Sequence, residues 1–418
     1  MLLRFRVDNY RSILKPVELS MVAIDEDRSA TRDFKLLDER VLTVAGIYGS
    51  NASGKSNTLE AIAWLSHAVR SSLRGWDKNV PRDPHRFGNG PSVPSYFEID
   101  LVVNGVRHWY SLEVDNSAIL YESLHSYPQR KARMLFEREG ENLKFRRGLN
   151  RASGIRDLLT PTTLILSAGT RLRDPELVDV GRAISQVGAL GLRMRRGMRT
   201  PPSFHSTYRL FQEGINRHPS SFFNPSTRGA ALDLLRFADS HIANVKTVAE
   251  EDDNLSRVRG RLVFIRNTND ESVTFDLYDE SAGTRAWFDL LGPALGALKR
   301  GEILLFDEID ASLHPRLSAR LLDLFQDPQT NRHGAQLIFT SHDTSLLSIL
   351  NRDEVWLTDK DSQGATRLVA LAEFQGSRVR RSLNLEKAYL QGRFGAVPDI
   401  DEVDVRRALG TTLEDLGE

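Results

Sequence analysis

The chain contains no cysteine among its 418 residues. This absence excludes a disulfide framework, a thiol nucleophile and a zinc site built on cysteine, and it suits a reducing cytosol. The chain also carries no net charge, since 56 Lys and Arg residues balance 56 Asp and Glu residues. Proteins that bind nucleic acid through charge alone are usually basic, so we expect contact with nucleic acid only locally and with the help of a partner.

Long apolar runs and heptad repeats are missing as well. The opening residues MLLRFRVDNYRSI have a charged side chain every second or third position, unlike a signal peptide. No stretch reaches the roughly 18 apolar residues of a transmembrane helix, so the sequence predicts a cytoplasmic protein without membrane contact. Since no heptad pattern persists, a long coiled coil is also excluded.

The first part of the chain shows strand patterns around one helix. Leu3, Phe5 and Val7 alternate with polar residues, which is typical of a half-buried strand. The run from Val41 to Tyr48 is apolar enough for a strand buried on both faces, and helical spacing follows from Gly54 to about Arg70.

From Pro91 to Phe145 the pattern changes to short β runs. Tyr96–Val103 and Val106–Val114, joined by Asn104-Gly105, predict a hairpin. The least regular part, roughly 166–255, holds helical patches at Leu177–Leu192 and Ala230–Val245.

Later segments alternate between strands and helices. This order predicts an α/β core, with strands at Arg261–Arg266, Ser272–Tyr278, Ile303–Phe306 and Gln336–Thr340, and helices at about Ala282–Lys299 and Pro315–Phe325. With 40% apolar and 27% charged residues, the length suits two to three globular units.

A phosphate-binding loop is the most specific motif. It matches G-x-x-x-x-G-K-[ST] through Gly49, Ser50, Asn51, Ala52, Ser53, Gly54, Lys55 and Ser56. The glycines permit a tight turn whose backbone N–H groups, together with a helix N-terminus, bind phosphates. Lys55 is expected to reach the β and γ oxygens of ATP, and the Ser56 hydroxyl to ligate magnesium. Because the motif lies between a strand pattern and a helix pattern, we prefer this interpretation to a chance match.

An acidic pair follows the apolar run Ile303–Phe306. Asp307 is placed to hold Mg²⁺ at the carboxyl end of a strand, and Glu308 to orient the attacking water as a general base. The alternative is a strand end with two solvated acids.

Three further motifs appear in a fixed order. Glu280-Ser281-Ala282-Gly283-Thr284 precedes a helix, Asp310-Ala311-Ser312-Leu313-His314-Pro315 follows the acidic pair, and Ser341-His342-Asp343 follows the run that ends at Thr340. With the phosphate loop, this order resembles the ABC-type ATPase heads of SMC, RecF and anti-phage OLD-like proteins, over about residues 1–65 and 270–350.

The resemblance implies a P-loop NTPase fold: a mixed central sheet with helices on both faces, an antiparallel β lobe and a helical insert. It implies four segments, with the phosphate loop and β lobe in 1–165, a mainly helical insert in 166–260, the remaining head in 261–350, and a hairpin and tail in 351–418. Ser281, Gly283 and Thr284 match the signature loop, Asp310 the D-loop and His342 the switch histidine. Arg11 and Ser12 match a segment beside the nucleotide phosphates, and Asn57 extends the phosphate loop.

The match has two departures. The signature lacks two adjacent glycines, and no clear Q-loop glutamine follows the first helix, since Gln129 is weakly placed. The segment Leu385–Pro398 resembles the ending of AbiLi/RloA-like ATPases of phage-defence systems. That resemblance implies a partner toxin or nuclease, such as an RloB-type protein.

Several residues also have plainer interpretations. His342 is alternatively a helix cap, and His314 fits a helix entry better than a catalytic role. Asp359-Lys360-Asp361 fits a hairpin turn better than a metal site. The basic segment Leu192–Arg199 fits a solvated helix face better than a contact with nucleic acid or a partner. The tail arginines fit a solvated surface equally well as a contact with a partner or RNA; they are Arg378, Arg380, Arg381 and Arg393.

The resemblance implies that a signature loop and a phosphate loop from different subunits enclose each ATP. We therefore expect an ATP-gated homodimer or higher even oligomer that acts as a sensor or scaffold for its partner. The rival function is a RecF- or SMC-type DNA clamp, which the neutral charge and missing coiled coil disfavour.

Overall fold

The computed structural model describes residues 1–25, 30–34, 39–149, 151–192, 207–212, 225–250, 259–267, 271–374 and 385–391. The basic residues 193–199, the tail residues 392–398 and Arg378, Arg380 and Arg381 were singled out from the sequence and lie outside the described residues.

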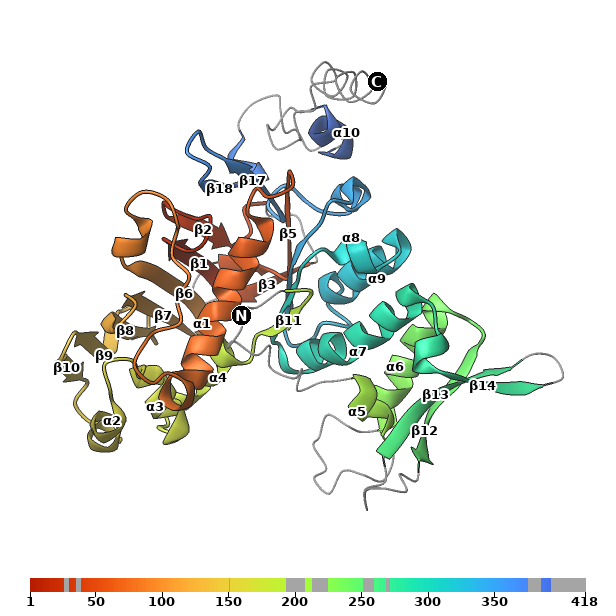
Figure 1. The fold of residues 1–418 in the computed structure, drawn as a ribbon, viewed down its shortest axis with the longest axis horizontal. Helices are drawn as coiled ribbons and strands as arrows, with labels where there is room; N and C mark the ends of the chain where they lie inside the picture. The colour runs from red at the N-terminus through yellow and green to blue at the C-terminus, as the bar shows by residue number, and fades with distance from the viewer. Residues whose placement is uncertain are drawn as a thin grey trace, which may run out of the picture.

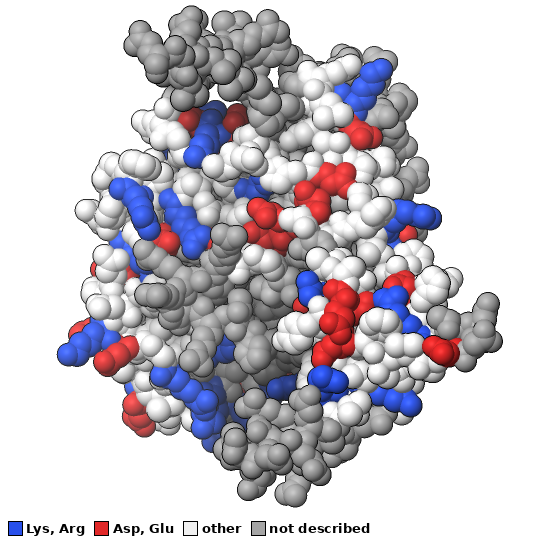
Figure 2. All heavy atoms as spheres, turned by 45° about the vertical axis from the view of Figure 1, so that its right-hand side comes forward, with Lys and Arg blue, Asp and Glu red and all other residues white. Residues whose placement is uncertain are grey.

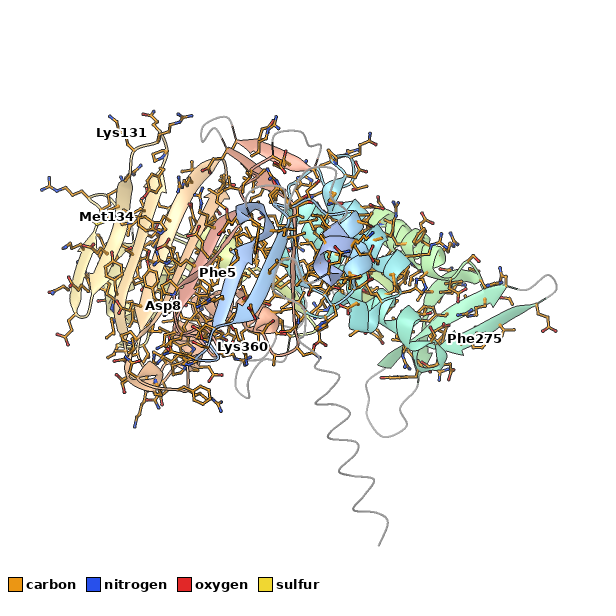
Figure 3. The ribbon with its side chains drawn as sticks, turned by 90° about the horizontal axis from the view of Figure 1, so that it is seen from above. Phe5, Asp8, Lys131, Met134, Phe275 and Lys360 are labelled. Atoms are coloured by element: carbon orange, nitrogen blue, oxygen red, sulfur yellow. The ribbon has the colours of Figure 1, made fainter. Side chains whose placement is uncertain are left out.

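An antiparallel sheet forms one end of the molecule (Figure 3, left). Its seven strands lie in the order β10-β9-β8-β7-β6-β1-β2. They span Leu2–Asp8 (β1), Val17–Ser20 (β2), Ser95–Val103 (β6), Val106–Val114 (β7), Ile119–Tyr127 (β8), Arg133–Glu139 (β9) and Asn142–Phe145 (β10). The predicted hairpin is confirmed as β6–β7, because Asn104 and Gly105 have the positive φ values, 50° and 77°, that a tight hairpin turn needs.

The central sheet carries the phosphate loop. Its six strands lie in the order β11-β15-β16-β5-β17-β18, parallel except for β18. They span Val44–Gly49 (β5), Gly188–Leu190 (β11), Ile303–Phe306 (β15), Gln336–Thr340 (β16), Val355–Lys360 (β17) and Thr366–Ala370 (β18). The run predicted as one strand from Val41 to Tyr48 divides at Thr43, and β4 (Glu39–Leu42) pairs instead with β3 (Thr31–Phe34).

Each central strand separates two cores. Ala45 and Ile47 of β5 face a core shared with α1 (Lys55–Gly75), whereas Val44 and Tyr48 face a core shared with α7 (Ala282–Arg300). Successive side chains of a strand point to opposite faces, so a continuous apolar run supplies buried side chains to both cores. Figure 1 shows α1 on one side of β5, and α7 and α9 (Pro315–Gln326) on the other. The predicted α/β fold with helices on both faces of the sheet is therefore confirmed.

The segment predicted as a mainly helical insert also contains strands. The first helical patch forms α4 (Val178–Ser185), which packs on α1 and α3 (Ile165–Arg171), and then strand β11 of the central sheet. The second ends earlier than predicted: α6 (Pro225–Ala238) is followed by strand β12 (Ile242–Glu250). Ile242 and Val245 pair with β13 (Arg259–Asn267), so strand pairing overrides their helical spacing. The proposed division at 166 and 260 remains a prediction.

The arm formed by α5 (Thr207–Phe211), α6 and strands β12 to β14 lies opposite the seven-stranded sheet (Figure 3, with Phe275 labelled). The remaining elements are η1 (Gly90–Ser92), α2 (Ala152–Leu158), β14 (Ser272–Asp276), η2 (Leu277–Asp279), α8 (Ile309–Ser312), η3 (Thr344–Ser348), η4 (Leu371–Glu373) and α10 (Leu385–Leu390). Among the described residues, none of the helices has the length and apolar character needed to cross a membrane.

Candidate functional site

The phosphate loop joins the end of β5 to the first turn of α1. Gly49 and Gly54 have φ values of 152° and 107°, and Gly54 precedes the helix directly. The Lys55 ammonium group lies inside the loop and donates to the carbonyl oxygens of Gly49 (2.9 Å) and Ser50 (3.0 Å). The glycines thus allow the backbone to curl around the lysine at the N-terminus of α1, an arrangement suited to phosphate binding.

The acidic pair and the loop meet, although they are 251 residues apart in the chain. The Ser56 hydroxyl donates to Asp307 Oδ1 at 2.9 Å, and the Thr340 hydroxyl donates to the same oxygen at 2.7 Å. Because β5, β16 and β15 are adjacent and parallel, their carboxyl ends lie at one edge of the sheet. Thr340 is a site residue that no sequence motif indicates.

Glu308 occupies a left-handed backbone conformation, with a φ of 53°. This region is costly for residues other than glycine, and such residues concentrate at functional sites. The backbone N–H of Glu308 donates to Thr340 Oγ1 at 2.7 Å. A single threonine therefore contacts both members of the acidic pair.

Asp310 connects the predicted D-loop to the predicted switch segment. Its Oδ1 atom accepts from the Ser341 hydroxyl (2.9 Å) and from the backbone N–H of His342 (3.1 Å). The His342 side chain is exposed. Both segments follow strands at the same edge of the sheet, and these two bonds join the residues after β15 to the residues after β16.

Arg11 lies beside α1 and pairs with two carboxylates. Its guanidinium group contacts Glu60 of α1 and, at 3.2 Å, Asp83 Oδ2, and it reaches Asn57 Oδ1 at 3.5 Å. The backbone of Arg11 also has a positive φ, 51°, and its N–H donates to the Asp83 carbonyl at 2.8 Å. Arg11 was predicted from the sequence, whereas its acidic partners Glu60 and Asp83 were not, since nothing in their spacing links them to Arg11.

Two threonines of the β17–β18 hairpin contact the loop from behind. Thr358 hydrogen-bonds to Ser53 Oγ at 2.6 Å, and the Thr366 hydroxyl donates to the Ser53 carbonyl at 2.8 Å. Thr366 also hydrogen-bonds to Ser12 Oγ, outside the loop, at 2.7 Å. The prediction gave this hairpin no role in the site, because sequence periodicity does not reveal that β17 pairs with β5.

The signature segment lies at the N-terminus of α7. Ser281 caps this helix by accepting from the Thr284 N–H at 3.1 Å, and Gly283 occupies its first turn. Glu280, 5% exposed, forms an ion pair with Arg266 of β13 at 2.6 Å, which anchors the segment to the arm. These hydrogen bonds and ion pairs do not involve the phosphate loop, and Figure 1 shows α7 on the opposite side of the central sheet from α1, the helix that follows the loop.

The side chains present suit a magnesium–nucleotide. Hydroxyl and carboxylate oxygens at Ser56 and Asp307 are the hard ligands that Mg²⁺ prefers, with the remaining positions left for phosphate and water. Burial lowers the pKa of Lys55, and three nearby carboxylates oppose this shift, those of Glu308, Asp307 and Asp310. Among the described residues, no group of three or more acidic or histidine side chains forms a self-contained metal site. The Ser56 and Asp307 oxygens fit a metal held jointly with its nucleotide, and the roles of the individual residues remain predictions.

Two plainer interpretations agree with the local geometry. His314 caps α9, since its Nδ1 accepts from the Arg316 N–H at 3.2 Å. Asp361 accepts from the backbone N–H groups of Gln363 and Ala365, both at 2.9 Å, which makes Asp359-Lys360-Asp361 part of a hairpin turn. Gln129 lies exposed between β8 and β9.

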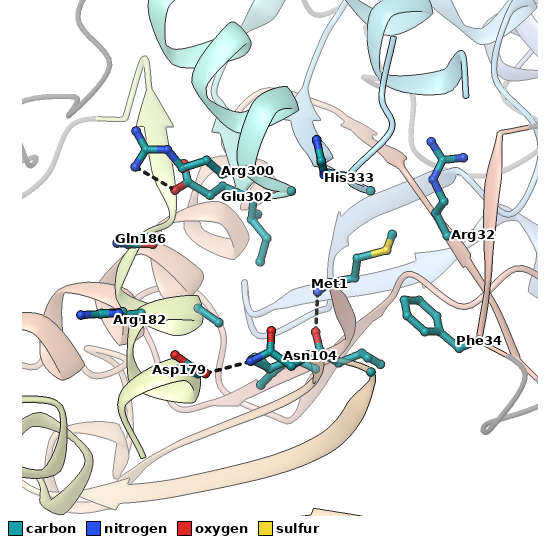
Figure 4. Close-up of a pocket in the computed structure, with 18 of the residues that line it drawn as sticks. Met1, Arg32, Phe34, Asn104, Asp179, Arg182, Gln186, Arg300, Glu302 and His333 are labelled. Carbon is teal, nitrogen blue, oxygen red and sulfur yellow. Dashed lines mark hydrogen bonds and ion pairs between the residues drawn. The ribbon is translucent and has the colours of Figure 1, made fainter. Parts of the chain in front are cut away.

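A separate cavity of about 550 Å³ opens at the amino ends of β15 and β16, opposite the phosphate loop (Figure 4). Its lining mixes charges of both signs with apolar groups. The Met1 amine, for example, donates to the Val102 carbonyl at 2.8 Å, and Asn104 donates to Asp179 at 2.8 Å. This mixture does not select one class of ligand.

The chain matches a known family over most of its length. Residues 44–348, more than half of the chain, match the family described as "AAA domain, putative AbiEii toxin, Type IV TA system". None of the curated proteins matches this sequence.

Solved structures that are similar to the chain at low identity include two SMC heads. One is the SMC head domain from Thermotoga maritima, with 16% identity, a TM-score of 0.41 and coverage of 88% of this chain and 98% of that one. The other is an SMC head bound to the C-winged helix domain of ScpA, with 12% identity, a TM-score of 0.46 and coverage of 88% and 97%.

Proposed function

This chain belongs to the family of AAA domains described for AbiEii toxins of type IV toxin–antitoxin systems, and on that premise we propose that it binds Mg²⁺-ATP at the phosphate loop and hydrolyses it to ADP and phosphate. The observation that carries the proposal is the hydrogen bond between Ser56 and Asp307, which joins the loop and the acidic pair at one edge of the sheet. P-loop ATPases use such a hydroxyl and carboxylate for their metal.

Each residue has a defined task in this proposal. The loop N–H groups and Lys55 hold the phosphates, while Ser56 and Asp307 hold the metal, which neutralises charge on the phosphates when bound. Glu308 orients a water molecule and accepts its proton, with its backbone fixed by Thr340. His342, placed by Asp310, contacts the γ-phosphate.

Phosphate release tests the site directly. We expect Lys55→Ala to abolish tight ATP binding and hydrolysis, because the buried ammonium group is lost. Lys360→Ala, at an exposed lysine, is the matched control and should keep wild-type turnover. Wild-type turnover by Lys55→Ala would remove the assignment.

The divided site supports assembly into a dimer. Ser281, Gly283 and Thr284 lie on α7 and contact residues of their own segment, so we propose that they meet the γ-phosphate bound by a second subunit. ATP would join the subunits and hydrolysis would release them. Mass photometry of Glu308→Gln, which keeps ATP bound, should show dimers or higher even oligomers with ATP and Mg²⁺. A strictly monomeric variant at saturating ATP would refute this assembly.

The family description, which names a toxin and a toxin–antitoxin system, supports a regulatory partner. We propose a cytoplasmic phage-defence role in which the ATP-gated assembly controls a toxin or nuclease, RloB-like or similar, that supplies any contact with nucleic acid. Copurification of the product of the neighbouring gene tests this role. Its absence from the purified ATP-bound protein would argue against it.

The rival function is a RecF- or SMC-like DNA clamp. Figure 2 shows one face of the molecule, on whose described part Lys and Arg side chains are interspersed with Asp and Glu. Such a mixed surface does not favour charge-driven binding to duplex DNA. Salt-sensitive binding of duplex DNA by this chain alone, with stimulated hydrolysis, would favour the clamp.

A further inference from the structure

The β17–β18 hairpin forms the wall behind the phosphate loop. Thr358 of β17 is the Cα partner of Gly49, and Thr366 begins β18. Their side chains are 0% and 2% exposed. Two buried hydroxyl groups from a distant part of the chain are thus placed against the phosphate loop.

The two motif glycines mark the points of closest approach. A Cβ atom on Gly49 would lie 2.4 Å from Thr358 Oγ1, and one on Gly54 would lie 2.0 Å from Thr366 Oγ1. Any side chain at either glycine would therefore collide with the hairpin. The glycines admit the threonines as well as the phosphates.

The donor and the acceptor in each Thr366 hydroxyl contact can be assigned, because a hydroxyl group donates only one hydrogen bond. A hydroxyl group has one proton to donate, and Thr366 Oγ1 donates it to the Ser53 carbonyl at 2.8 Å. In the 2.7 Å contact with Ser12, the Ser12 hydroxyl must then be the donor. Ser12 Oγ accepts in turn from Asn57 Nδ2, so one chain of bonds runs from Asn57 through Ser12 and Thr366 to Ser53.

The backbone adds a second connection between the same partners. The Thr366 N–H donates to the Ser12 carbonyl at 2.8 Å. Residue 366 therefore holds the Arg11–Ser12 segment by two bonds and the loop by one. No hydrogen bond in the described structure links Ser12 directly to Ser53.

We propose that Thr366 is a positioning residue that fixes the Arg11–Ser12 segment against the phosphate loop, so that both contact the nucleotide as one unit. This inference rests on the proposed ATP site. It gives the C-terminal hairpin a task in nucleotide affinity, and it leaves Glu308 and Asp307, held by Thr340, to determine turnover.

Substitution at 366 tests the proposal in the full-length protein. Thr366→Val keeps the shape and removes the hydroxyl, and we expect the KM for ATP and the Kd of a fluorescent ATP analogue to rise about tenfold, with kcat changed less than about twofold. Thr366→Ser restores the hydroxyl and should return the KM for ATP and the Kd of the analogue to within about twofold of wild type. If Thr366 had a merely structural role, the variant would show a lower kcat and a lower active fraction, and KM would not rise with kcat retained.

The matched control is Thr43→Val. Thr43 is 0% exposed, adjoins the amino end of β5 and donates to the Ala30 carbonyl at 3.0 Å, far from the loop end of that strand. This variant loses an equivalent buried hydrogen bond and should keep the wild-type KM. A similar KM rise in Thr43→Val would show a general loss of packing and overturn the proposal.

A double-mutant cycle with Ser12→Ala tests the coupling. Both side chains act through one chain of bonds. We therefore expect the KM of the double variant to exceed the KM of the single variant that binds ATP more weakly by less than about threefold. Full multiplication of the two effects would overturn the proposal. If Thr366→Val does not fold, Ser12→Ala alone must still raise KM with kcat retained.

The two proposals fail in different ways. If the wild-type protein binds no ATP analogue, the proposed function fails. If the wild type binds, Lys55→Ala does not and Thr366→Val binds normally, only the positioning role is overturned.

Discussion

Thr340 is the residue through which the acidic pair is held in place. Its hydroxyl donates to Asp307 Oδ1 and accepts from the Glu308 N–H, both at 2.7 Å. Since one donated and one accepted bond exhaust most of its capacity, the group fixes a side chain and a backbone at once.

We predict that Thr340→Val lowers kcat about tenfold, because Asp307 and Glu308 lose their shared partner. The KM for ATP should change less than kcat, since the loop and hairpin contacts remain. Steady-state phosphate release measures both constants. Thr330→Val, which removes a hydroxyl bond to the Leu324 carbonyl away from the site, is the control. Equal kcat values in the two variants would contradict this role.

Glu308 illustrates a conflict between local stability and function. Its φ of 53° favours glycine, yet the site places a carboxylate there. We predict that Glu308→Gly is more stable than Glu308→Ala by about 1 kcal/mol, because both lose the carboxylate and only alanine retains the backbone strain. Urea unfolding of the two variants measures the difference. Equal stability would show that the strain is relieved elsewhere.

At the scale of elements, Glu122 anchors the start of α3 to β8. Its carboxylate, 0% exposed, accepts from the N–H groups of Ile165 (2.7 Å) and Leu166 (3.0 Å) and from the Tyr110 hydroxyl (3.1 Å). Burial nevertheless raises the pKa of Glu122, with the hydrogen bonds opposing this shift.

The raised pKa predicts a pH-dependent stability. The folded state keeps the Glu122 proton at pH values where the unfolded state has lost it, so this stabilisation is fully present below the ordinary value of 4.5 and is lost as pH rises through the folded pKa. The free energy of unfolding of wild type minus that of Glu122→Gln should therefore fall as pH rises above 4.5. Urea titrations across this range measure the difference.

Glu137→Gln provides a contrast of opposite sign. The Lys144 ammonium, 2.7 Å away, lowers the pKa of Glu137, so any small stabilisation there is lost as pH falls. The free energy of unfolding of wild type minus that of Glu122→Gln is expected to fall as pH rises. If this difference instead grew with pH, as the Glu137 contribution does, the predicted effect of burial would be contradicted.

The sequence predicts those elements whose conformation is determined by neighbouring residues. The phosphate loop, the strand before Asp307 and the Asn104-Gly105 turn follow from local spacing, and the structure confirms these elements. The start of β12 was predicted as helical because its local apolar spacing is helical, although its partner β13 follows nearby. Strand β11 was predicted as part of a helix because its partner β15 lies more than 100 residues further along the chain. The supporting contacts of the site, at Thr340, Thr358 and Thr366, were missed for the same reason.

At the scale of the whole molecule, α10 packs against the region of the switch segment. Its Tyr389 ring meets that of Tyr48 at a centroid distance of 6.2 Å, and Thr344 of η3 donates to Glu386 at 3.3 Å. Tyr48 directly precedes Gly49, and η3 begins two residues after His342. Figure 1 shows α10 beyond β17 and β18, on the side of the molecule that carries the phosphate loop.

We predict that Tyr389→Ala destabilises the protein by about 3 kcal/mol, because the ring is 8% exposed and fills the contact with Tyr48. Tyr278→Ala, at a side chain that is 82% exposed, should change stability by less than about 0.5 kcal/mol. Urea unfolding compares the two variants. A neutral Tyr389→Ala would mean that α10 contributes little to the fold.

The strand order of the central sheet has a consequence for biosynthesis. Strand β5 lies between β16 and β17, neither of which exists until the ribosome has added nearly 300 further residues. At ordinary elongation rates this interval lasts on the order of tens of seconds. During that time the nascent strand lacks both of its neighbouring strands, so the edge of the sheet that carries the phosphate loop cannot form. Chains that terminate early would remain open to chaperones and proteases.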